Sequence, residues 1–248
     1  MTEQEKADLK TIKNIQAKFK KAINEYGLIA DNDHILVGLS GGKDSLALVE
    51  LLGERSKIFV PRFKVSAAHI TVSNISYESD LQYLENFCQQ HGVDFVHRAT
   101  SFDMEQDPTK STCFLCSWHR RKKLFAIAEE LGCNKIALGH HMDDMVETLL
   151  LNLVYQGAMA SMPAKLKMEK FDMQIIRPLA LLTEKEIREL EKIRNYKQQK
   201  KSCPYEKDSS RSDAKALVQM LEKWNPDVRK SLMAAMDNIK HDYLPRKN

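Results

Sequence analysis

The feature that most constrains the fold is a short apolar run that ends in two glycines and leads directly into a helical pattern. Residues 34–39 (His-Ile-Leu-Val-Gly-Leu) are apolar and partly β-branched, as is typical of a buried strand in a parallel sheet. Residues 40–45 (Ser-Gly-Gly-Lys-Asp-Ser) follow, and residues 44–53 have helical character. A strand that turns sharply into a helix begins a βαβ unit, so the sequence predicts a parallel sheet covered by helices.

The rest of the chain continues this alternation of strands and helices. Further strands are expected at 63–70, 93–97, 135–138 and 174–178. Helices are expected at 77–91, 118–131, 142–155, 213–223 and 227–240. Loop composition marks the segments 103–116, 157–171 and 196–212. We therefore expect an α/β, Rossmann-like fold with a parallel five-stranded sheet and helices on both faces.

The two ends of the chain add helices to this predicted domain. Apolar residues recur three and four positions apart between 9 and 23, which predicts an amphipathic N-terminal helix. Its other face is rich in lysine; we interpret that face as solvated, with contact to nucleic-acid phosphate as the alternative. The predicted division is an N-terminal helix in 1–30, the α/β domain in 31–195 and a C-terminal helical segment in 196–248.

Composition limits the class of protein and its partners. Of 248 residues, 43% are apolar, which is enough for a folded core. The apolar stretches are far short of a bilayer span and the charged N-terminus lacks a signal-peptide core, so we expect a cytoplasmic protein with no membrane partner. The net charge of +4 permits a polyanionic partner without requiring one. An odd count of five cysteines argues against a disulfide framework.

The glycine loop has the composition of an anion cradle. Two adjacent glycines let the backbone turn tightly and bring N–H groups close to an anion, and the helix start adds unpaired amides and a partial positive charge. The spacing is neither that of a Walker A loop nor that of the dinucleotide fingerprint, and a tight turn without a ligand is the alternative. We expect phosphate or pyrophosphate to bind at Ser40, Gly41, Gly42, Lys43, Asp44 and Ser45.

A second polar cluster follows the strand expected at 135–138. It reads Gly-His-His-Met-Asp-Asp over residues 139–144 and runs into the next predicted helix. His140 and His141 could donate to phosphate oxygens. Asp143, in the first helical turn, could hold magnesium or simply cap the helix.

Three cysteines form a candidate metal or cluster site. Cys113 and Cys116 make a Cys-x-x-Cys pair, which alone is ambiguous between redox, zinc and iron–sulfur chemistry. Cys203 is a third candidate ligand, and with zinc His119 could complete a tetrahedral site instead. The other two cysteines lie in or beside helical patterns and are expected in the core; they are Cys88 and Cys133.

Together these motifs resemble those of the PP-loop ATP pyrophosphatases, which cleave ATP to AMP and pyrophosphate. Ser-Gly-Gly-x-Asp-Ser after the first strand is their signature, and Gly-His-His-x-Asp-Asp is similar to the segment found in members that modify tRNA. The resemblance implies an adenine nucleotide alpha hydrolase-type fold, with the β- and γ-phosphates on the loop and magnesium near Asp44 and Asp143. Further ATP contacts implied by it are His69, Gly139 and His140.

The cysteine segment narrows the resemblance to the tRNA 2-thiocytidine synthetases. It reads Cys-x-x-Cys-Ser-x-x-Arg-Arg from 113 to 121, and Arg-Pro-Leu follows at 177–179. In that family three cysteines bind a [4Fe-4S] cluster, and the matching positions are Cys113, Cys116 and Cys203. The sequence departs from the family at Glu206, where a fourth cysteine is often found, and at 69–73 (His-Ile-Thr-Val-Ser), where an Asn-x-Asp-like stretch is usual.

The resemblance also implies an activity. ATP would adenylate the C2 oxygen of a tRNA cytidine, and sulfur from the cluster would replace AMP, with Asp44, Asp143, Cys113 and Cys116 as catalytic residues. The implied partners are tRNA, a sulfur donor such as a cysteine desulfurase, and a second copy of the chain. RNA phosphates would meet two basic runs, at Arg120, Arg121, Lys200 and Lys201.

Three alternatives stay open at this point. Uridine thiolation uses the same ATP chemistry, although such enzymes often carry additional zinc-type cysteine pairs. Lysidine synthesis uses lysine on the activated cytidine and needs no cluster, so the three cysteines count against it. A zinc-stabilised RNA-binding module without catalysis predicts zinc and no ATP turnover, and the intact glycine loop counts against it.

Overall fold

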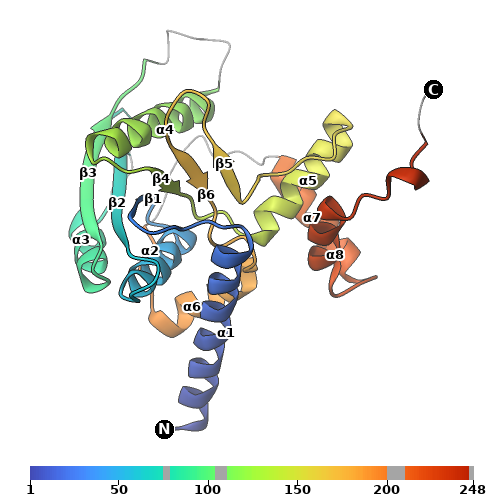
Figure 1. Cartoon of the computed structure of the whole chain (residues 1–248), viewed down its shortest axis with the longest axis horizontal. Coiled ribbons are helices and arrows are strands. Elements are labelled where there is room, and N and C mark those ends of the chain that lie inside the picture. Colours follow the sequence, from blue (N-terminus) through green and yellow to red (C-terminus); the bar gives the residue numbers. More distant parts are fainter. Residues whose placement is uncertain (75–78, 104–110, 200–209, 246–248) are drawn as a thin grey trace. The chain divides into compact units, whose positions relative to one another are not determined.

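The computed structural model describes residues 1–74, 79–103, 111–199 and 210–245 (Figure 1). The chain divides into two compact units, of which the first comprises Met1–His141 and Ala164–Glu206. The second comprises Met142–Pro163 and Lys207–Asn248. These units cut the chain at points other than the boundaries expected after residues 30 and 195, because the N-terminal helix packs into the core of the first unit.

A six-stranded sheet organises the first unit. Its strands are β1 Asp33–Gly38, β2 Phe63–Val72, β3 Asp94–Thr100, β4 Lys135–Ala137, β5 Lys165–Lys167 and β6 Gln174–Ile176. The strand order is β3-β2-β1-β4-β6-β5. Neighbouring strands run parallel except for β5, which pairs antiparallel with β6. The predicted parallel α/β fold is therefore confirmed in class.

The described sheet has one strand more than the five that were predicted. The segment 157–171 was expected to be a loop, but its residues 165–167 form β5. All three residues of β5 are exposed, so no apolar periodicity marks this strand in the sequence. It exists because Leu166 lies opposite Ile175 in the register with β6, which is a tertiary contact.

Among its described residues, the first unit has five helices. They are α1 Glu3–Glu25, α2 Lys43–Ser56, α3 Leu81–Gln90, α4 Thr112–Glu130 and α6 Glu184–Arg194. The helix expected at 77–91 begins partly outside the described residues, and α6 was not predicted. Its local signal was the capping box at Thr183, whose hydroxyl accepts from the Glu186 N–H while the Glu186 carboxylate accepts from the Thr183 N–H.

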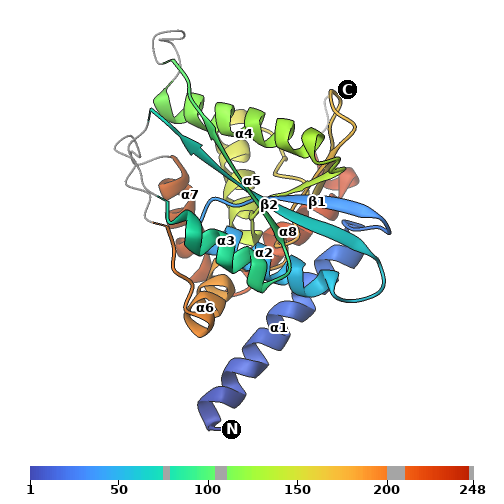
Figure 2. The ribbon, with the colours of Figure 1, turned by 90° about the vertical axis from the view of Figure 1, so that its left-hand side faces the viewer.

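These helices cover both faces of the sheet, because side chains alternate along each strand. Ile35 and Val37 of β1 point into a core shared with α1, α2, α3 and α6. Leu36, between them, points into a second core under α4. Figure 2 shows α4 on one side of the sheet and α2 and α3 on the other. The sheet is thus buried on both faces, as its nearly continuous apolar strands require.

The second unit is helical. Its described elements are α5 Met142–Gln156, α7 Ser210–Glu222, α8 Val228–Asp237 and a short 3-10 helix at His241–Tyr243. Met142, Val146 and Leu150 of α5 pack against Val218 of α7 to form its small core. In the part of the chain that the structure describes, none of the helices combines the length and apolar character needed to cross a membrane.

Candidate functional site

The two polar motifs leave adjacent parallel strands at the same edge of the sheet. β1 ends at Gly38, two residues before Ser40 of the glycine loop, and β4 ends at Ala137, two residues before Gly139 of the Gly-His-His segment. β1 and β4 are hydrogen-bonded neighbours, with Val37 opposite Ala137. The strand order reverses at β1, since β2 and β3 lie on one side of it and β4 and β6 on the other. In open α/β sheets this is where ligands bind.

The glycine loop is held in its turn by Ser45. The Ser45 hydroxyl accepts a hydrogen bond from the Gly41 N–H at 3.1 Å and donates one to the Gly42 carbonyl at 2.9 Å. Its oxygen also lies 3.2 Å from the Ser40 hydroxyl. Only 4% of Ser45 is exposed. The expected phosphate contact of Ser45 stays a prediction, and the bonds observed here shape the loop from inside.

Two backbone features of the loop suit it to an anion. Gly41 has φ +83°, a left-handed conformation that other residues adopt at a cost. Gly42 is the N-cap of α2 and provides no side-chain cap, so the amides of the first turn keep their capacity to bind a ligand. The positive end of the α2 dipole adds to this effect.

Gly139 allows the Gly-His-His segment to pack closely against the glycine loop. A Cβ at this glycine would lie 3.1 to 3.2 Å from backbone atoms of Asp44 and Ser45. Backbone atoms yield less readily than the end of a flexible side chain, so a larger residue would push the two motifs apart. The same close approach brings His141 Nε2 to 3.8 Å from Asp44 Oδ1.

Asp44 is the best candidate ligand for a cation in the first unit. Lys43 Nζ donates to Asp44 Oδ2 at 3.1 Å and lies 3.0 Å from Oδ1, which is buried and accepts no hydrogen bond from the described residues. Lys43 Nζ also lies 3.5 Å from Glu184. The ion pair with Lys43 offsets part of the cost of burying Oδ1, and a cation bound there would offset more of it. A hard oxygen of this kind fits magnesium, which binds through one or two carboxylates and phosphate oxygens.

Arg177 sets the role of His140. The Arg177 guanidinium donates from Nε to His140 Nδ1 at 3.2 Å, and only 7% of Arg177 is exposed. Because arginine is always a donor, this bond makes Nδ1 the acceptor of a neutral imidazole. In that tautomer Nε2 carries the ring proton, and the expected contact of His140 with a phosphate oxygen stays a prediction. Sequence reasoning gave Arg177 no role, although it lies in the Arg-Pro-Leu segment.

His69 is placed beside the loop but is not open to solvent. Its ring nitrogens lie 2.8 Å from the Leu39 carbonyl and 2.8 Å from the Ser79 hydroxyl, and 1% of the residue is exposed. It therefore ties the end of β1 to the segment before α3. The ATP contact expected of His69 stays a prediction, and one that would involve the backbone or the ring face of this residue.

The segment that leaves α6 crosses the glycine loop, a role that was not predicted from the sequence. We call residues 194–199, which start at the last residue of α6, the strap. The Gln199 N–H donates to the Gly41 carbonyl at 2.9 Å, and Gln199 Oε1 accepts from the Asp80 N–H at 2.5 Å. The side chain of Gln199 occupies the place where a Cβ on Gly41 would stand. The glycine loop is therefore held from outside as well as from inside.

The strap is anchored on the helix that follows the loop. Glu50 of α2 is 2% exposed and accepts from Arg194 Nε at 2.9 Å and from the Tyr196 hydroxyl at 2.7 Å. Burial, with the Glu50 carboxylate beside it, raises the pKa of Tyr196 far above its ordinary value, so the phenol stays a donor. The signal in the sequence was a carboxylate inside the apolar run at 46–52.

Two of the three proposed cluster cysteines lie at the start of α4. Cys113 is exposed, whereas Cys116 is buried and packs in a small apolar cluster with Val72, the last residue of β2. The thiols therefore lie at the same edge of the sheet as the glycine loop. The helix begins at Thr112, six residues earlier than expected, because the Ser111 hydroxyl caps it by accepting from the Phe114 N–H.

The donor set fits an iron–sulfur cluster as far as the structure describes it. Two cysteines one helical turn apart offer the thiolate ligands that such clusters need. Cys203, Lys200 and Lys201 lie outside the described residues. Within the described ranges, His, Cys, Asp and Glu side chains do not gather in threes as a metal site would require. Cys88 and Cys133 are core residues as predicted, and burial raises their thiol pKa to about 12 and about 11.

Asp143 belongs to the second unit and is ion-paired there. Arg229 Nε lies 2.6 Å from Asp143 Oδ1, and Arg229 also pairs with Glu222. Only 7% of Asp143 is exposed. A magnesium ion at this carboxylate would compete with the guanidinium, so the metal role of Asp143 stays a prediction. Arg229 is a further residue that local sequence patterns did not single out.

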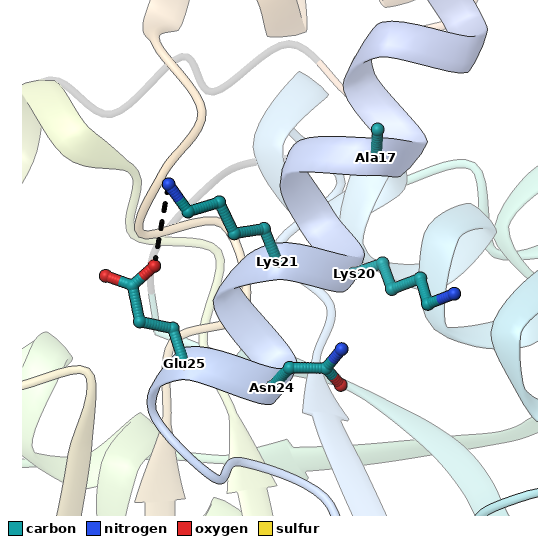
Figure 3. Close-up of a pocket in the computed structure, with 5 residues that line it drawn as sticks. All are labelled: Ala17, Lys20, Lys21, Asn24 and Glu25. Carbon is teal, nitrogen blue, oxygen red and sulfur yellow. Dashed lines mark ion pairs between the residues drawn. The ribbon is translucent and has the colours of Figure 1, made fainter.

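The hollow shown in Figure 3 lies on α1 and is separate from this edge of the sheet. Its lining residues all come from one helix; they are Ala17, Lys20, Lys21, Asn24 and Glu25. Lys21 pairs with Glu25 at 3.7 Å. α1 leads into the amino end of β1, whereas the glycine loop leaves its carboxyl end. The lysine face of α1 therefore adds no residue to the candidate site.

Comparison with known proteins gives matches over most of the chain. A family profile described as the PP-loop domain matches residues 11–219. The tRNA-cytidine(32) 2-sulfurtransferase of Citrifermentans bemidjiense is 33% identical over 236 residues, covering 93% of this chain and 92% of that protein. The protein of the same name from Idiomarina loihiensis is 36% identical over 237 residues, covering 94% of this chain and 78% of the relative.

A solved structure resembles the chain over a similar extent. It is the U34-tRNA thiolase NcsA from Methanococcus maripaludis with its [4Fe-4S] cluster. The TM-score is 0.74 at 27% identity, and the match covers 92% of this chain and 78% of that one. The likeness therefore takes in nearly the whole chain.

Proposed function

The chain belongs to the PP-loop family that includes the tRNA-cytidine(32) 2-sulfurtransferases, and on that premise we propose that it is an ATP-dependent enzyme that thiolates a cytidine of tRNA at C2. The family membership agrees with the predicted resemblance. The observation that carries the proposal is the closure of Gly139 onto Asp44 and Ser45. This contact joins the glycine loop and the Gly-His-His segment into one site at the edge where the sheet reverses its order.

The proposed first step activates the nucleoside. The C2 oxygen of the cytidine attacks the α-phosphorus of ATP, and the bond between that phosphorus and the pyrophosphate oxygen breaks. The loop amides, Lys43 and the Nε2–H of His140 would stabilise the charge that develops on pyrophosphate. A magnesium ion bound at Asp44, with Asp143 as a second proposed ligand, would neutralise phosphate charge.

The proposed second step replaces AMP by sulfur at C2. Cys113, Cys116 and Cys203 would hold a [4Fe-4S] cluster, which supplies the sulfur-transfer chemistry when bound. The exposed position of Cys113 and the place of Cys116 beside the end of β2 support this, since both are at the edge where ATP would bind. We further propose a sulfur donor such as a cysteine desulfurase, a homodimeric assembly and a magnesium requirement.

Uridine thiolation is the second candidate activity. It is favoured by the similarity to the U34-tRNA thiolase NcsA, whose structure contains a [4Fe-4S] cluster. The cytidine-modifying relatives are the more similar in sequence, at 33 to 36% identity against 27%. The two activities share the ATP step and differ in the nucleoside that is held over the site.

One experiment separates these possibilities. The protein is purified without oxygen, its iron, sulfide and zinc are measured, and it is incubated with ATP, a sulfide source and unmodified tRNA. Mass spectrometry of the digested tRNA then detects 2-thiocytidine or 2-thiouridine. About four irons and 2-thiocytidine, formed with AMP and pyrophosphate, are expected. A colourless zinc protein that leaves ATP intact would contradict the proposal, and 2-thiouridine would replace the cytidine assignment.

A further inference from the structure

One face of α4 is open along its first three turns. Buried side chains on the opposite face include Leu115, Leu124 and Phe125. The exposed residues come in adjacent pairs that recur every four positions, as expected for one side of a helix. Its members are Cys113, Phe114, Ser117, Trp118, Arg121 and Lys122, and we call them the α4 face.

Two aromatic rings dominate this face. Phe114 is 50% exposed and Trp118 is 47% exposed, and their spacing of four residues makes them neighbours on the helix surface. The Trp118 ring is oriented by its surroundings, because the His119 ring meets it edge-on at 4.8 Å and Lys122 Nζ lies 5.4 Å from its centroid. The α4 face therefore offers a held indole with much of its surface accessible.

The charged side chains that α4 itself places around these rings have one sign. Residues 120–123 read Arg-Arg-Lys-Lys, and α4 has no acidic residue before Glu129. Such a run would add little binding free energy for an apolar protein partner, whereas each contact with a polyanion would be electrostatically favourable. Aromatic rings flanked by basic side chains are the combination that binds single-stranded nucleic acid, through base stacking and phosphate contacts.

Position connects this face to the reaction. Trp118 follows Cys113 by five residues, which corresponds to about 7.5 Å along the helix axis. An enzyme that modifies C2 of a base must take that base or its neighbours out of the helical stack, and a protein ring can replace the lost stacking. We propose that the α4 face is a stacking surface for unpaired bases of the tRNA substrate, with Trp118 as the principal platform and Arg121 and Lys122 on the flanking phosphates. The inference rests on the proposed function for the identity of the RNA.

Tryptophan fluorescence allows a direct test. The chain has two tryptophans, so Trp224→Phe leaves Trp118 as the reporter. In oxygen-free holoenzyme carrying this change, tRNA is expected to quench the emission of Trp118. Against the wild-type enzyme, Trp118→Ala is expected to weaken tRNA binding about tenfold, while Trp118→Phe retains a ring and stays within about threefold. Trp224→Ala, in the second unit, is the matched control and leaves the Kd unchanged.

The outcomes keep the inference and the proposed function apart. If the wild-type enzyme forms the thionucleoside but Trp118→Ala binds tRNA as tightly and Trp118 emission is not quenched, the stacking surface is refuted and the thiolase is not. If no thionucleoside forms although Trp118→Ala loses tRNA affinity, the inference stands and the proposed reaction fails. If Trp118→Ala instead converts a dimer to a monomer in sedimentation without changing the tRNA Kd, the face is a contact between copies and the inference is overturned.

Discussion

Gly41 meets two separate requirements at one position of the glycine loop. Its φ of +83° lies in the left-handed region, and the Gln199 side chain fills the space of a Cβ. Gly92 meets only the first requirement, since its φ is +71° and a Cβ there would have no heavy atom within 4 Å. An alanine at Gly92 therefore tests backbone strain alone, whereas an alanine at Gly41 tests strain together with a clash against the strap.

The first prediction uses this pair. Gly92→Ala is expected to lower the free energy of unfolding by about 1 kcal/mol and to leave ATP binding unchanged. Gly41→Ala is expected to weaken ATP binding at least about tenfold, because the methyl group displaces Gln199 as well as straining the turn. Urea unfolding measures the change in stability, and calorimetric titration measures the affinity of both variants for ATP. A Cβ on Gly41 would overlap Gln199 Cγ and lie 2.8 Å from Gln199 Cβ, so the double variant Gly41→Ala/Gln199→Gly removes the clash and should recover part of the affinity; no recovery would show that the strap plays no part.

The second prediction concerns the buried thiols. Burial raises the pKa of Cys88 to about 12 and that of Cys133 to about 11. Because the folded state holds these protons to a higher pH than the unfolded chain, their stabilising contribution is complete below about pH 9 and declines as pH rises toward 11 and 12. At pH 9 both should resist iodoacetamide in native protein and react in urea. Peptide mass spectrometry reads this out, and rapid labelling of native Cys88 at pH 9 would contradict the buried placement.

At the scale of elements, the strap is a tertiary brace for the helix that starts at the glycine loop. It joins α6 to α2 through Glu50 and to the segment before α3 through Lys197, whose Nζ lies 2.6 Å from Asp80. The hydrogen bond from Lys197 lowers the pKa of Asp80, so this outer link persists at neutral pH. Glu50 is the buried half of the brace, and its loss would leave the Tyr196 hydroxyl buried without an acceptor.

The third prediction tests that brace. Glu50→Ala is expected to lower the free energy of unfolding by about 2 to 3 kcal/mol and to weaken ATP binding, because Arg194 and Tyr196 lose their acceptor. Glu50→Gln keeps an oxygen for Tyr196 and should cost about 1 kcal/mol. Urea unfolding measures both. Glu54→Gln, one turn further along α2 in an exposed pair with Lys57, is the control and should change stability by less than about 0.5 kcal/mol. Equal effects of the Glu50 and Glu54 changes would rule out the brace.

At the scale of the molecule, the parallel sheet decides which surfaces can serve the reaction. The carboxyl ends of β1, β2 and β4 carry the glycine loop, the apolar contact of Cys116 and the Gly-His-His segment. The amino ends carry structural contacts instead. An example is the buried ion pair of Lys135 Nζ with Asp33 Oδ2 at 2.6 Å, which joins β4 to β1. An RNA substrate should therefore depend on basic residues near the first edge and not on those near the second.

The fourth prediction follows from this asymmetry. The affinity for tRNA should fall steeply between about 50 and 200 mM salt, since phosphate contacts release counterions. Lys122→Gln is expected to lower the slope of log affinity against log salt by about 1. Lys57→Gln, between α2 and β2 at the other edge, should leave the slope unchanged. Filter binding over a salt series makes the comparison, and equal slopes for both variants would place the RNA elsewhere.

The predictability of the fold varied with the range of the interactions. The strand–loop–helix unit around 34–53 was predicted because its apolar run, its glycines and its helix start lie next to one another in the sequence. The start of α4 was predicted too far along the chain, because the cap at Ser111 lets the helix begin earlier than the apolar pattern indicated. β5 was missed because three exposed residues form a strand only through their partner β6.

By itself, the sequence determined the class of fold, the family and the types of side chain that the chemistry needs, because periodicity and motif spacing are local properties. The tertiary structure decided which of these side chains meet. Gly139 reaches Asp44, Arg177 orients His140, and Glu50 holds Arg194 and Tyr196 across 144 and 146 positions of the chain. Such contacts depend on strand order and on how helices cover the sheet. The glycine loop was therefore visible in the sequence, whereas the groups that hold it in place became visible only in the fold.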